Sequence, residues 1–257
     1  MRDLFNVENK LVLVTGGSRG IGEMIARAFV LNGARVLISS RNTGACDALA
    51  EDLAQQGSCE ALPFDLANAE GVAGLAVRLE QSYGRLDVLV NNAGATWGAP
   101  LDDFPESGWD KTVNLNLKTP FFLTQKLLPA LRRAASADAP ARVINIASID
   151  GLSPPEFNSF AYSASKAGLL MLTRHMARKL AADNILVNAI APGFFSSKMT
   201  EATLEEIGEE VLKATPLGRL GTPDDIGGVA LFLAARASAF LTGAIIPCDG
   251  GLSTTGR

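Results

Sequence analysis

A tyrosine and a lysine stand four residues apart in the stretch YSASK, as Tyr162 and Lys166. On a helix, side chains at this spacing lie on one face, so the phenol and the ammonium can share one groove. A tyrosine with an ordinary pKa of about 10 is a poor acid or base at neutral pH. We expect the ammonium to favour the phenolate and to lower the pKa of Tyr162, so that the pair can carry a proton.

Two more polar residues, Ser148 and Asn116, are candidates for the same site. Ser148 follows the apolar run 142–147, where a strand is expected to end. Asn116 stands four residues before Pro120 in a long helical pattern, and proline has no N–H to donate to its carbonyl. The Asn116 carbonyl is therefore expected to be free at a kink and to suit an ordered water. The alternative is a kink that only curves the helix around a sheet.

Short apolar runs alternate with helical patterns along the whole chain. The runs are mostly continuous, which is typical of strands buried on both faces. Strands are expected at 11–15, 35–40, 60–64, 86–91, 142–147, 185–190 and 243–247, and helices at 20–32, 43–55, 69–83, 109–135, 160–183 and 223–235. This alternation predicts a single-domain, doubly wound α/β Rossmann fold over residues 1–257, with a seven-stranded parallel sheet flanked by helices. Such sheets bind ligands beyond the carboxyl ends of their strands, so those ends should carry the chemistry.

The composition narrows the class of protein. The chain has 257 residues, 23 of them basic and 27 acidic, and its net charge of −4 argues against a nucleic-acid partner. No apolar run reaches membrane-spanning length, and the first residues lack the apolar core of a signal peptide. The three cysteines are scattered and show no metal-ligand spacing, so neither a disulfide framework nor a metal site is expected. These features favour a cytoplasmic protein.

The first expected strand ends in the glycine-rich stretch TGGSRGIG, residues 15–22. Gly16, Gly20 and Gly22 frame a turn into a helix, where backbone N–H groups can hold a phosphate at close approach. The spacing differs from the G-x-G-x-x-G fingerprint of many dinucleotide-binding proteins. An ordinary glycine-rich turn is the alternative.

The end of the second expected strand bears on the choice of cofactor. An NAD site would place Asp or Glu there to bind the ribose 2′-hydroxyl, but the chain has Ser39, Ser40 and Arg41. Arg41, together with Arg19 in the glycine-rich turn, suits a 2′-phosphate, which favours NADP(H). The alternative is that Arg41 is a solvated loop residue. Asp65, after the third strand, can accept a hydrogen bond from the adenine amine or can cap a helix.

The motifs TGGSRGIG, NNAG, YSASK and APG stand in the order and context of the short-chain dehydrogenase/reductase family. The resemblance covers nearly the whole chain, from about residue 10 to residue 251, and within the family the sequence is similar to the 3-oxoacyl (β-ketoacyl) reductases. It implies an NADPH-dependent carbonyl reductase. Another secondary-alcohol dehydrogenase, for a sugar alcohol, steroid or small ketone, is the first alternative. A dinucleotide-sensing protein without turnover is the second.

The resemblance implies a role for each of four catalytic residues. Tyr162 would be the general acid, Lys166 would bind the nicotinamide ribose and lower the tyrosine pKa, Ser148 would hold the substrate oxygen, and Asn116 would anchor a water. The cofactor-binding residues implied are Gly16, Ser18, Arg19, Gly20, Ile21, Gly22, Arg41, Asp65, Leu66, Asn92, Ala93, Gly94, Tyr162, Lys166, Pro192, Gly193 and Ser197. In NNAGATWG, Asn91 and Asn92 should tie the fourth strand to its neighbours. Trp97 either faces the substrate cleft or packs as a surface aromatic.

The substrate side and the assembly are the least determined parts of this interpretation. The resemblance implies a small carbonyl substrate, carried on CoA or on an acyl carrier protein, and no membrane or nucleic-acid partner. The acidic segment 194–215 is expected to be a helical lid over the substrate. Its alternative is a solvated surface helix. The helical patterns at 109–135 and 160–183 have apolar residues on more than one face, and the resemblance implies a homotetramer built from them. His175, the one histidine, is expected to be structural.

Overall fold

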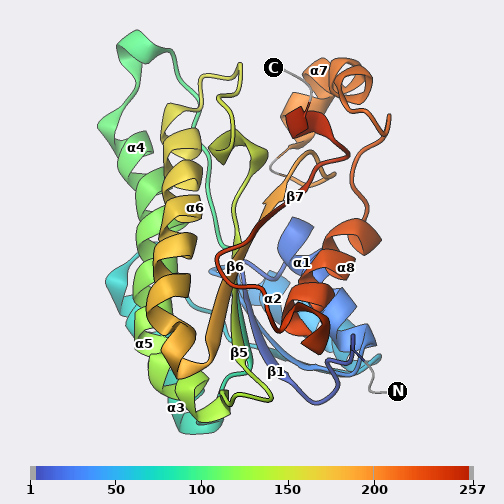
Figure 1. Cartoon of the computed structure of the whole chain (residues 1–257). Coiled ribbons are helices and arrows are strands. Elements are labelled where there is room, and N and C mark those ends of the chain that lie inside the picture. Colours follow the sequence, from blue (N-terminus) through green and yellow to red (C-terminus); the bar gives the residue numbers. More distant parts are fainter. Residues whose placement is uncertain (1–3, 199, 255–257) are drawn as a thin grey trace.

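The computed structural model describes residues 4–198 and 200–254, and its centre is a seven-stranded parallel sheet (Figure 1). The strands are β1 (Leu11–Thr15), β2 (Arg35–Ser39), β3 (Ser58–Ala61), β4 (Val88–Asn91), β5 (Ala141–Ile146), β6 (Ile185–Pro192) and β7 (Ile245–Cys248). Their spatial order is β3-β2-β1-β4-β5-β6-β7, and every neighbouring pair is parallel. The predicted fold class is therefore confirmed. The order reverses between β1 and β4, which is where such sheets place a ligand crevice.

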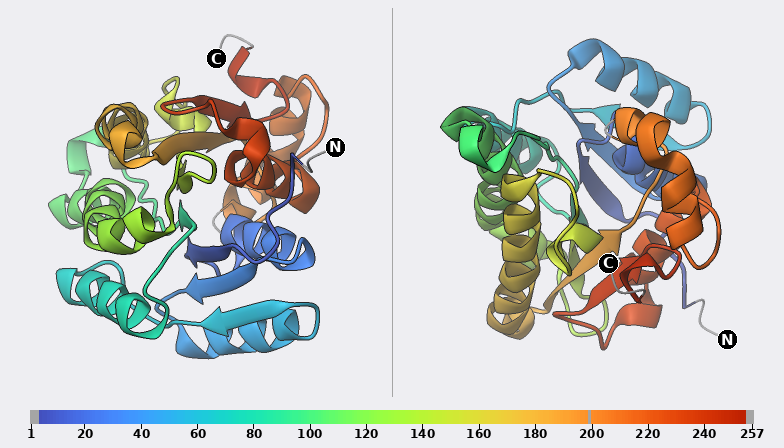
Figure 2. Two further views of the ribbon diagram at one scale, coloured as in Figure 1. Left: turned by 60° about the horizontal axis from the view of Figure 1, so that its bottom comes forward. Right: turned by 90° about the horizontal axis from the view of Figure 1, so that it is seen from above.

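Helices cover both faces of the sheet (Figures 1 and 2). The helices are α1 (Gly20–Leu31), α2 (Thr43–Ala54), α3 (Ala69–Ser82), α4 (Glu106–Val113), α5 (Thr119–Ala134), α6 (Phe160–Leu180), α7 (Glu201–Ala214) and α8 (Pro223–Ala234). One core lies between the sheet and α1, α2 and α8, and the second lies between the sheet and α3, α5 and α6. Two apolar layers on one sheet explain why the strands read as continuous apolar runs.

Strand β3 is where the predicted boundaries fail most clearly. The strand is Ser58–Ala61, whereas the apolar content predicts 60–64. β3 is an edge strand that pairs only with β2, and its residues alternate between exposed and half-buried. Its backbone pairing therefore extends over polar residues that an apolar-run criterion misses, while Leu62 lies beyond the strand and still donates its N–H to Ile38.

The helix predicted at 109–135 consists of three consecutive segments. A π-helical stretch, Asn114–Lys118, lies between α4 and α5. The Thr119 N–H donates to the Asn114 carbonyl five residues earlier, so one turn is widened immediately before Pro120. Proline at the start of α5 lacks the N–H that a regular turn would use there. The π-helical turn therefore costs little free energy. The irregularity was expected, but its π geometry was not.

The carboxyl ends of the strands point to the upper edge of the molecule in Figure 1, below α7. The loop that precedes α4 rises on one side of this edge, and the segment with α7 rises on the other (Figure 1). The predicted lid, 194–215, corresponds to this second segment, and its Met199 lies outside the described residues. Over residues 4–198 and 200–254, no helix has the length and apolarity to cross a membrane.

Candidate active site

The glycine-rich turn after β1 is fixed by the loop that follows β4. The Asn92 side-chain amide donates to the carbonyls of Thr15 at 2.9 Å and Gly16 at 3.2 Å. The Thr15 hydroxyl accepts from the backbone N–H groups of Asn92 and Ala93 and donates to Val90. The strand ends of β1 and β4 are therefore joined by a buried polar clamp. This confirms the structural role predicted for Asn92, while Thr15 was missed although it is the polar end of an apolar run.

Two glycines of this turn have no room for a side chain. Gly16 has a φ of +62°, a left-handed conformation that favours glycine. A Cβ on Gly22 would lie 2.3 Å from the Gly16 carbonyl oxygen and 2.4 Å from the Asn92 amide nitrogen. Helix α1 therefore starts directly against the turn, and the backbone itself forms the surface that faces a ligand.

The start of α1 is suited to a pyrophosphate. Its N-cap, Arg19, makes no side-chain hydrogen bond to the first turn, whereas the starts of α2 and α3 are capped by Asn42 and Asn68. A helix start without a side-chain acceptor leaves its first N–H groups available to an anion. The predicted phosphate-binding residues Ser18, Gly20 and Ile21 belong to this turn, so the residues present fit a dinucleotide.

The end of β2 carries one buried and one exposed polar residue, Ser39 and Arg41. Ser39 is fully buried, and its hydroxyl has no hydrogen-bond partner among the described residues. Arg41 follows on the surface, next to Ser40, whose hydroxyl donates to Asn42. The exposed Arg41 guanidinium is suited to a 2′-phosphate, whereas the Ser39 hydroxyl lies inside the sheet without exposed surface.

The alternative reading of Asp65 as a helix cap is wrong. Asn68 is the N-cap of α3, and its side chain accepts from the Gly71 N–H at 2.7 Å. Asp65 instead accepts from the Ala67 N–H in a local turn, and its carboxylate is exposed. Leu66 beside it is buried, and its carbonyl accepts from the Thr119 hydroxyl. The predicted adenine contact of Asp65 stays a prediction.

The loop after β6 closes the crevice from the other side. Pro192 is the last residue of β6, and a Cβ on Gly193 would lie 2.8 Å from the Asp249 Cβ, so this loop packs against the chain after β7. A Cβ on Gly20 would lie 3.2 Å from the Ser197 Cβ. The glycine-rich turn and the base of the predicted lid are therefore in contact, as a shared cofactor site requires.

Ser148, Tyr162 and Lys166 come together at the ends of β5 and α6. Ser148 follows β5, and Tyr162 and Lys166 lie on the first two turns of α6. The Lys166 ammonium is 5.4 Å from the Tyr162 ring centroid and donates to the Ile146 carbonyl at 2.8 Å. Only 4% of Lys166 is exposed. The predicted sharing of one groove by the phenol and the ammonium is confirmed in geometry.

The predicted lowering of the tyrosine pKa is wrong for this structure. Burial raises the pKa of Tyr162 to about 12, with a further upward contribution from the Asp150 carboxylate, while hydrogen bonding with Ser148 opposes the shift. Burial also lowers the pKa of Lys166 to about 8, although Asp150 acts to raise it. Desolvation is therefore the largest cause of both shifts and sets their direction. At neutral pH the phenol holds its proton, which is the state of a proton donor.

Asn116 lies beside this group but makes side-chain contacts that were not foreseen. Its side-chain oxygen accepts from the Ala95 N–H at 2.8 Å, and its amide donates to the Ala95 carbonyl and to the Ser165 hydroxyl. A Cβ on Gly94 would lie 3.2 Å from the Asn116 side-chain oxygen and 3.8 Å from the Lys166 ammonium. The NNAG loop is thus held between Asn116 and Lys166. The role of the Asn116 backbone carbonyl stays a prediction.

A buried amide ladder lies behind the site. The Asn91 amide donates to Thr124 and, at 2.9 Å, to the Asn145 side-chain oxygen, and the Asn145 amide donates to the Thr173 hydroxyl. This ladder connects β4, β5, α5 and α6. The prediction for Asn91 is confirmed, whereas Asn145 and Thr173 were missed because each lies inside an apolar pattern.

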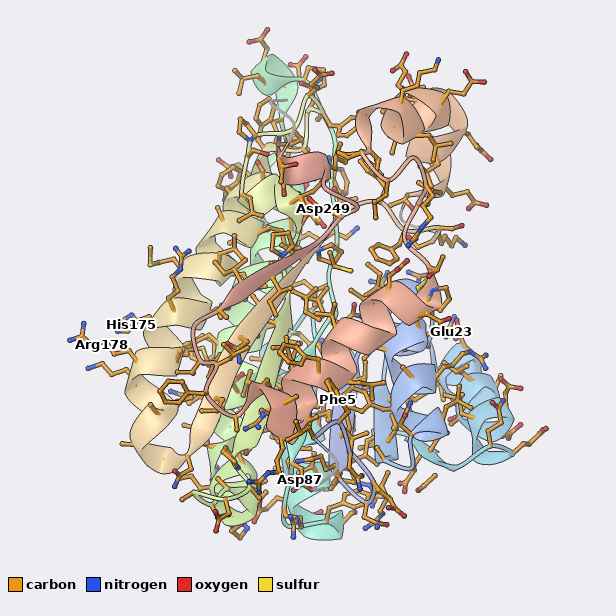
Figure 3. The ribbon with its side chains drawn as sticks, turned by 45° about the vertical axis from the view of Figure 1, so that its right-hand side comes forward. Phe5, Glu23, Asp87, His175, Arg178 and Asp249 are labelled. Carbon is orange, nitrogen blue, oxygen red and sulfur yellow. The ribbon has the colours of Figure 1, made fainter. Side chains whose placement is uncertain are left out.

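Two aromatic or basic candidates lie away from the reacting groups. Trp97 packs over Gly108 of α4, where an added Cβ would lie 2.6 Å from the indole, and the Lys111 ammonium lies 5.1 Å from its centroid. This supports the surface-packing alternative. His175 is exposed and, with Arg178, points away from the sheet on the outer side of α6 (Figure 3).

The cysteines show no sign of redox or metal chemistry. Cys46, Cys59 and Cys248 are free thiols, and burial raises the pKa of Cys59 to about 12 and that of Cys248 to about 11. Within the described part of the chain, no three His, Cys, Asp or Glu side chains are grouped as metal ligands.

Comparison with known proteins agrees with this geometry. The family model described as enoyl-(acyl carrier protein) reductase matches residues 16–253. A rhamnolipids biosynthesis 3-oxoacyl-[acyl-carrier-protein] reductase of Pseudomonas aeruginosa is 46% identical over 98% of this chain and 99% of its own length. The 3-oxoacyl-[acyl-carrier-protein] reductase FabG of Thermotoga maritima is 38% identical, over 96% and 98%. The solved Pseudomonas aeruginosa RhlG/NADP active-site complex superposes with a TM-score of 0.94 at 45% identity, covering 98% of this chain and 100% of that one.

These matches span both the glycine-rich turn and the Ser148–Tyr162–Lys166 group, and they confirm the resemblance drawn from the motifs. The chain belongs to the short-chain dehydrogenase/reductase family.

Proposed function

We propose that this protein is an NADPH-dependent carbonyl reductase that converts 3-oxoacyl thioesters to 3-hydroxyacyl thioesters. One observation carries the proposal: the Tyr162 phenol and the Ser148 hydroxyl lie together beside the buried Lys166 ammonium, next to a turn suited to a dinucleotide. The similarity to two 3-oxoacyl-[acyl-carrier-protein] reductases supports the substrate class.

The residues that would hold the cofactor form a continuous path along the carboxyl edge. The first turn of α1 would bind the pyrophosphate, and Arg41 would bind the 2′-phosphate. The backbone at Gly94 and the base of the lid at Ser197 complete the cradle. NADPH, when bound, supplies the hydride.

Side chains of the protein bind the substrate carbonyl oxygen and donate the proton. Tyr162 and Ser148 donate hydrogen bonds to the substrate carbonyl oxygen and polarise it. As negative charge develops on that oxygen, Tyr162 transfers its phenolic proton to it, which yields the hydroxyl product. The Lys166 ammonium behind the ring stabilises the phenolate that remains. Solvent then returns a proton to the phenolate before the next turnover.

The segment 194–215 acts as the substrate lid in this proposal. Phe195 is buried and bridges to Gly221, which fixes the start of the segment, and Val211 is a buried side chain of α7. Ile207 interrupts the helix with φ of −128° and ψ of 19°. A segment fixed at its base and interrupted in its helix can adjust over substrates of different length.

Initial rates with a substrate panel test the function. We expect 3-oxoacyl-CoA and 3-oxoacyl carrier protein to be reduced with NADPH at higher kcat/KM than simple ketones, steroids or keto sugars. Preference for a keto sugar would favour the alternative of another secondary-alcohol dehydrogenase. Tight NADPH binding without turnover on any substrate would favour a dinucleotide-sensing protein.

The cofactor assignment has a separate test. Arg41→Asp places a carboxylate where a ribose 2′-hydroxyl would be bound, and it repels a 2′-phosphate. We expect the ratio of kcat/KM for NADPH over NADH to fall by roughly ten- to a hundredfold, the equivalent of one charge-assisted contact. An unchanged ratio would contradict the assignment. Asn32→Ala on the far end of α1 serves as a control.

A cytoplasmic homotetramer is part of the same proposal. Phe121 and Phe122 on α5 and Met171 on α6 are exposed apolar side chains on the helices predicted to pair. Exposed aromatic side chains of this kind are typical of subunit contacts. Analytical ultracentrifugation should give a tetramer mass, and Phe121→Glu with Phe122→Glu should lower it. A monomer in the unchanged protein would overturn this part alone.

A further inference from the structure

Asp150 lies in a short turn packed between two catalytic groups. It belongs to the 3-10 turn Ile149–Gly151, directly after Ser148. Its backbone N–H donates to the Ser148 hydroxyl at 3.1 Å. On the other side, a Cβ on Gly151 would lie 2.7 Å from the Lys166 backbone carbonyl carbon. The turn, and with it the backbone of Asp150, is therefore fixed against both Ser148 and α6.

The Asp150 carboxylate acts on a site that contains a buried positive charge, the Lys166 ammonium. Lys166 is almost fully buried and donates a hydrogen bond to the uncharged Ile146 carbonyl. Burying an ammonium is costly unless a negative charge is near. The charged groups that face the pair from the packed elements are Asp150, from the turn, and Tyr162 and Lys166 themselves, from α6. Among the described residues, Asp150 is the one carboxylate that acts on both groups.

We propose that Asp150 is an electrostatic positioning residue that keeps the Tyr162 phenol and the Lys166 ammonium protonated in the working pH range. The inference rests on the proposed function, because it assigns Asp150 a part in the same proton transfer. Asp150 does not exchange a proton with the substrate. It acts through Tyr162 and Lys166, and its negative charge makes proton loss from either group less favourable.

The sign of the effect follows from charge alone. A negative charge stabilises the ammonium over the amine and destabilises the phenolate next to the phenol, so it raises the pKa of both groups. Removing the charge lowers both. The protonated pair that reduction needs is then lost at a lower pH.

Asp150→Asn is the decisive variant. Asparagine has nearly the same shape, and the hydrogen bond to Ser148 comes from the backbone N–H, so this substitution removes the charge and keeps that bond. We expect the alkaline decline of kcat/KM for 3-oxoacyl reduction to move down by roughly half to one pH unit. Asp150→Glu should restore the original profile. Glu156→Gln, which removes an exposed carboxylate from the loop that follows, should leave it unchanged.

A second readout needs neither substrate nor cofactor. The chain has two tyrosines, so in a Tyr83→Phe background the tyrosinate absorbance near 295 nm reports Tyr162 alone. Adding Asp150→Asn should bring the onset of this absorbance to a lower pH, over the range where far-UV circular dichroism stays constant. Adding Tyr162→Phe should abolish it.

The outcomes separate the two proposals. An unchanged protein that reduces no 3-oxoacyl thioester refutes the proposed function, while the tyrosinate titration still tests Asp150. An active protein in which Asp150→Asn moves neither the pH profile nor the titration refutes the role of Asp150. A lower rate at every pH with an unmoved profile also refutes it, because a purely structural contribution would have that signature.

Discussion

The carboxyl edge of the sheet and the lid segment 194–215 differ in how their side chains are held. At the edge, Asn91 and Asn145 are buried and Asn92 is half-buried, and all three bond to other strands, loops or helices. On the lid, α7 presents five exposed glutamates, Glu201, Glu205, Glu206, Glu209 and Glu210, to solvent. The edge is preorganised by internal hydrogen bonds, whereas the lid is defined mainly by charge. We therefore expect the edge to set the reaction type and the proposed lid to set the substrate range.

The largest effect should come from Tyr162→Phe at the rigid edge. Phenylalanine keeps the ring beside Lys166 but removes the proton donor, and positioned acid–base groups contribute roughly 10²- to 10⁴-fold to rate. We expect kcat for carbonyl reduction to fall by about a thousandfold while NADPH affinity, followed by cofactor fluorescence, changes little. Comparable activity in the variant would show that another group delivers the proton.

The buried amide ladder should govern stability rather than chemistry. Asn145→Leu keeps the volume but leaves the Asn91 amide with the more distant Thr124 hydroxyl and removes the donor to Thr173. Unpaired buried polar groups cost about 1–3 kcal/mol each, so we expect a loss of about 2 kcal/mol in the free energy of unfolding. Urea denaturation measures it. Gln81→Ala, at an exposed side chain of α3, should change stability by less than about 0.5 kcal/mol.

A site residue can be predicted from the sequence when a local pattern of neighbouring residues marks it. Strand ends such as Ser148 and Asn92 are marked by a polar residue after an apolar run, and the i, i+4 spacing of Tyr162 and Lys166 is local, so these positions were predictable. Thr15 was missed although it ends an apolar run in the same way, and Asn145 was missed because it lies inside an apolar run; the partners of both lie far away in the sequence. A hydrogen bond between distant segments has no local pattern.

The direction of the pKa shift of Tyr162 is the property that residue types predict least well. Spacing alone predicts that Lys166 lowers the pKa of Tyr162, but the structure shows that burial decides the sign. Desolvation depends on how completely the surrounding elements cover a group, and this is known only after the fold is known. The π-helical turn Asn114–Lys118 is similar, since Pro120 predicts an irregularity but not its form.

The pH dependence of the reaction should follow Lys166. Its pKa of about 8 means that the ammonium is present below that pH and is lost as the pH rises above it. We expect kcat/KM for reduction to be level near neutral pH and to fall above about pH 8, approaching tenfold per unit. Far-UV circular dichroism over the same range controls for unfolding. A level profile up to pH 10 would mean that the buried ammonium stays charged or is dispensable.

The smallest effect should come from the lid, and it should appear in substrate binding alone. Glu205→Gln with Glu206→Gln removes two exposed negative charges from α7, and surface substitutions of this kind alter stability by less than about 0.5 kcal/mol. An acyl-CoA is itself an anion, so we expect its KM to fall a few-fold at low ionic strength, with kcat unchanged. The difference should vanish at about 0.5 M salt, where charges are screened.

A control double substitution on α2 tests whether the change in KM comes from the charges on α7. Asp47→Asn with Glu51→Gln removes two exposed charges from α2, which covers the other end of the sheet, and should leave KM unchanged. If both pairs lower KM equally, the net charge of the protein, rather than the lid, repels the substrate. If only the lid pair does so and the decrease disappears with salt, α7 contributes charge to an entrance whose chemistry is fixed elsewhere, at the hydrogen-bonded edge beneath it.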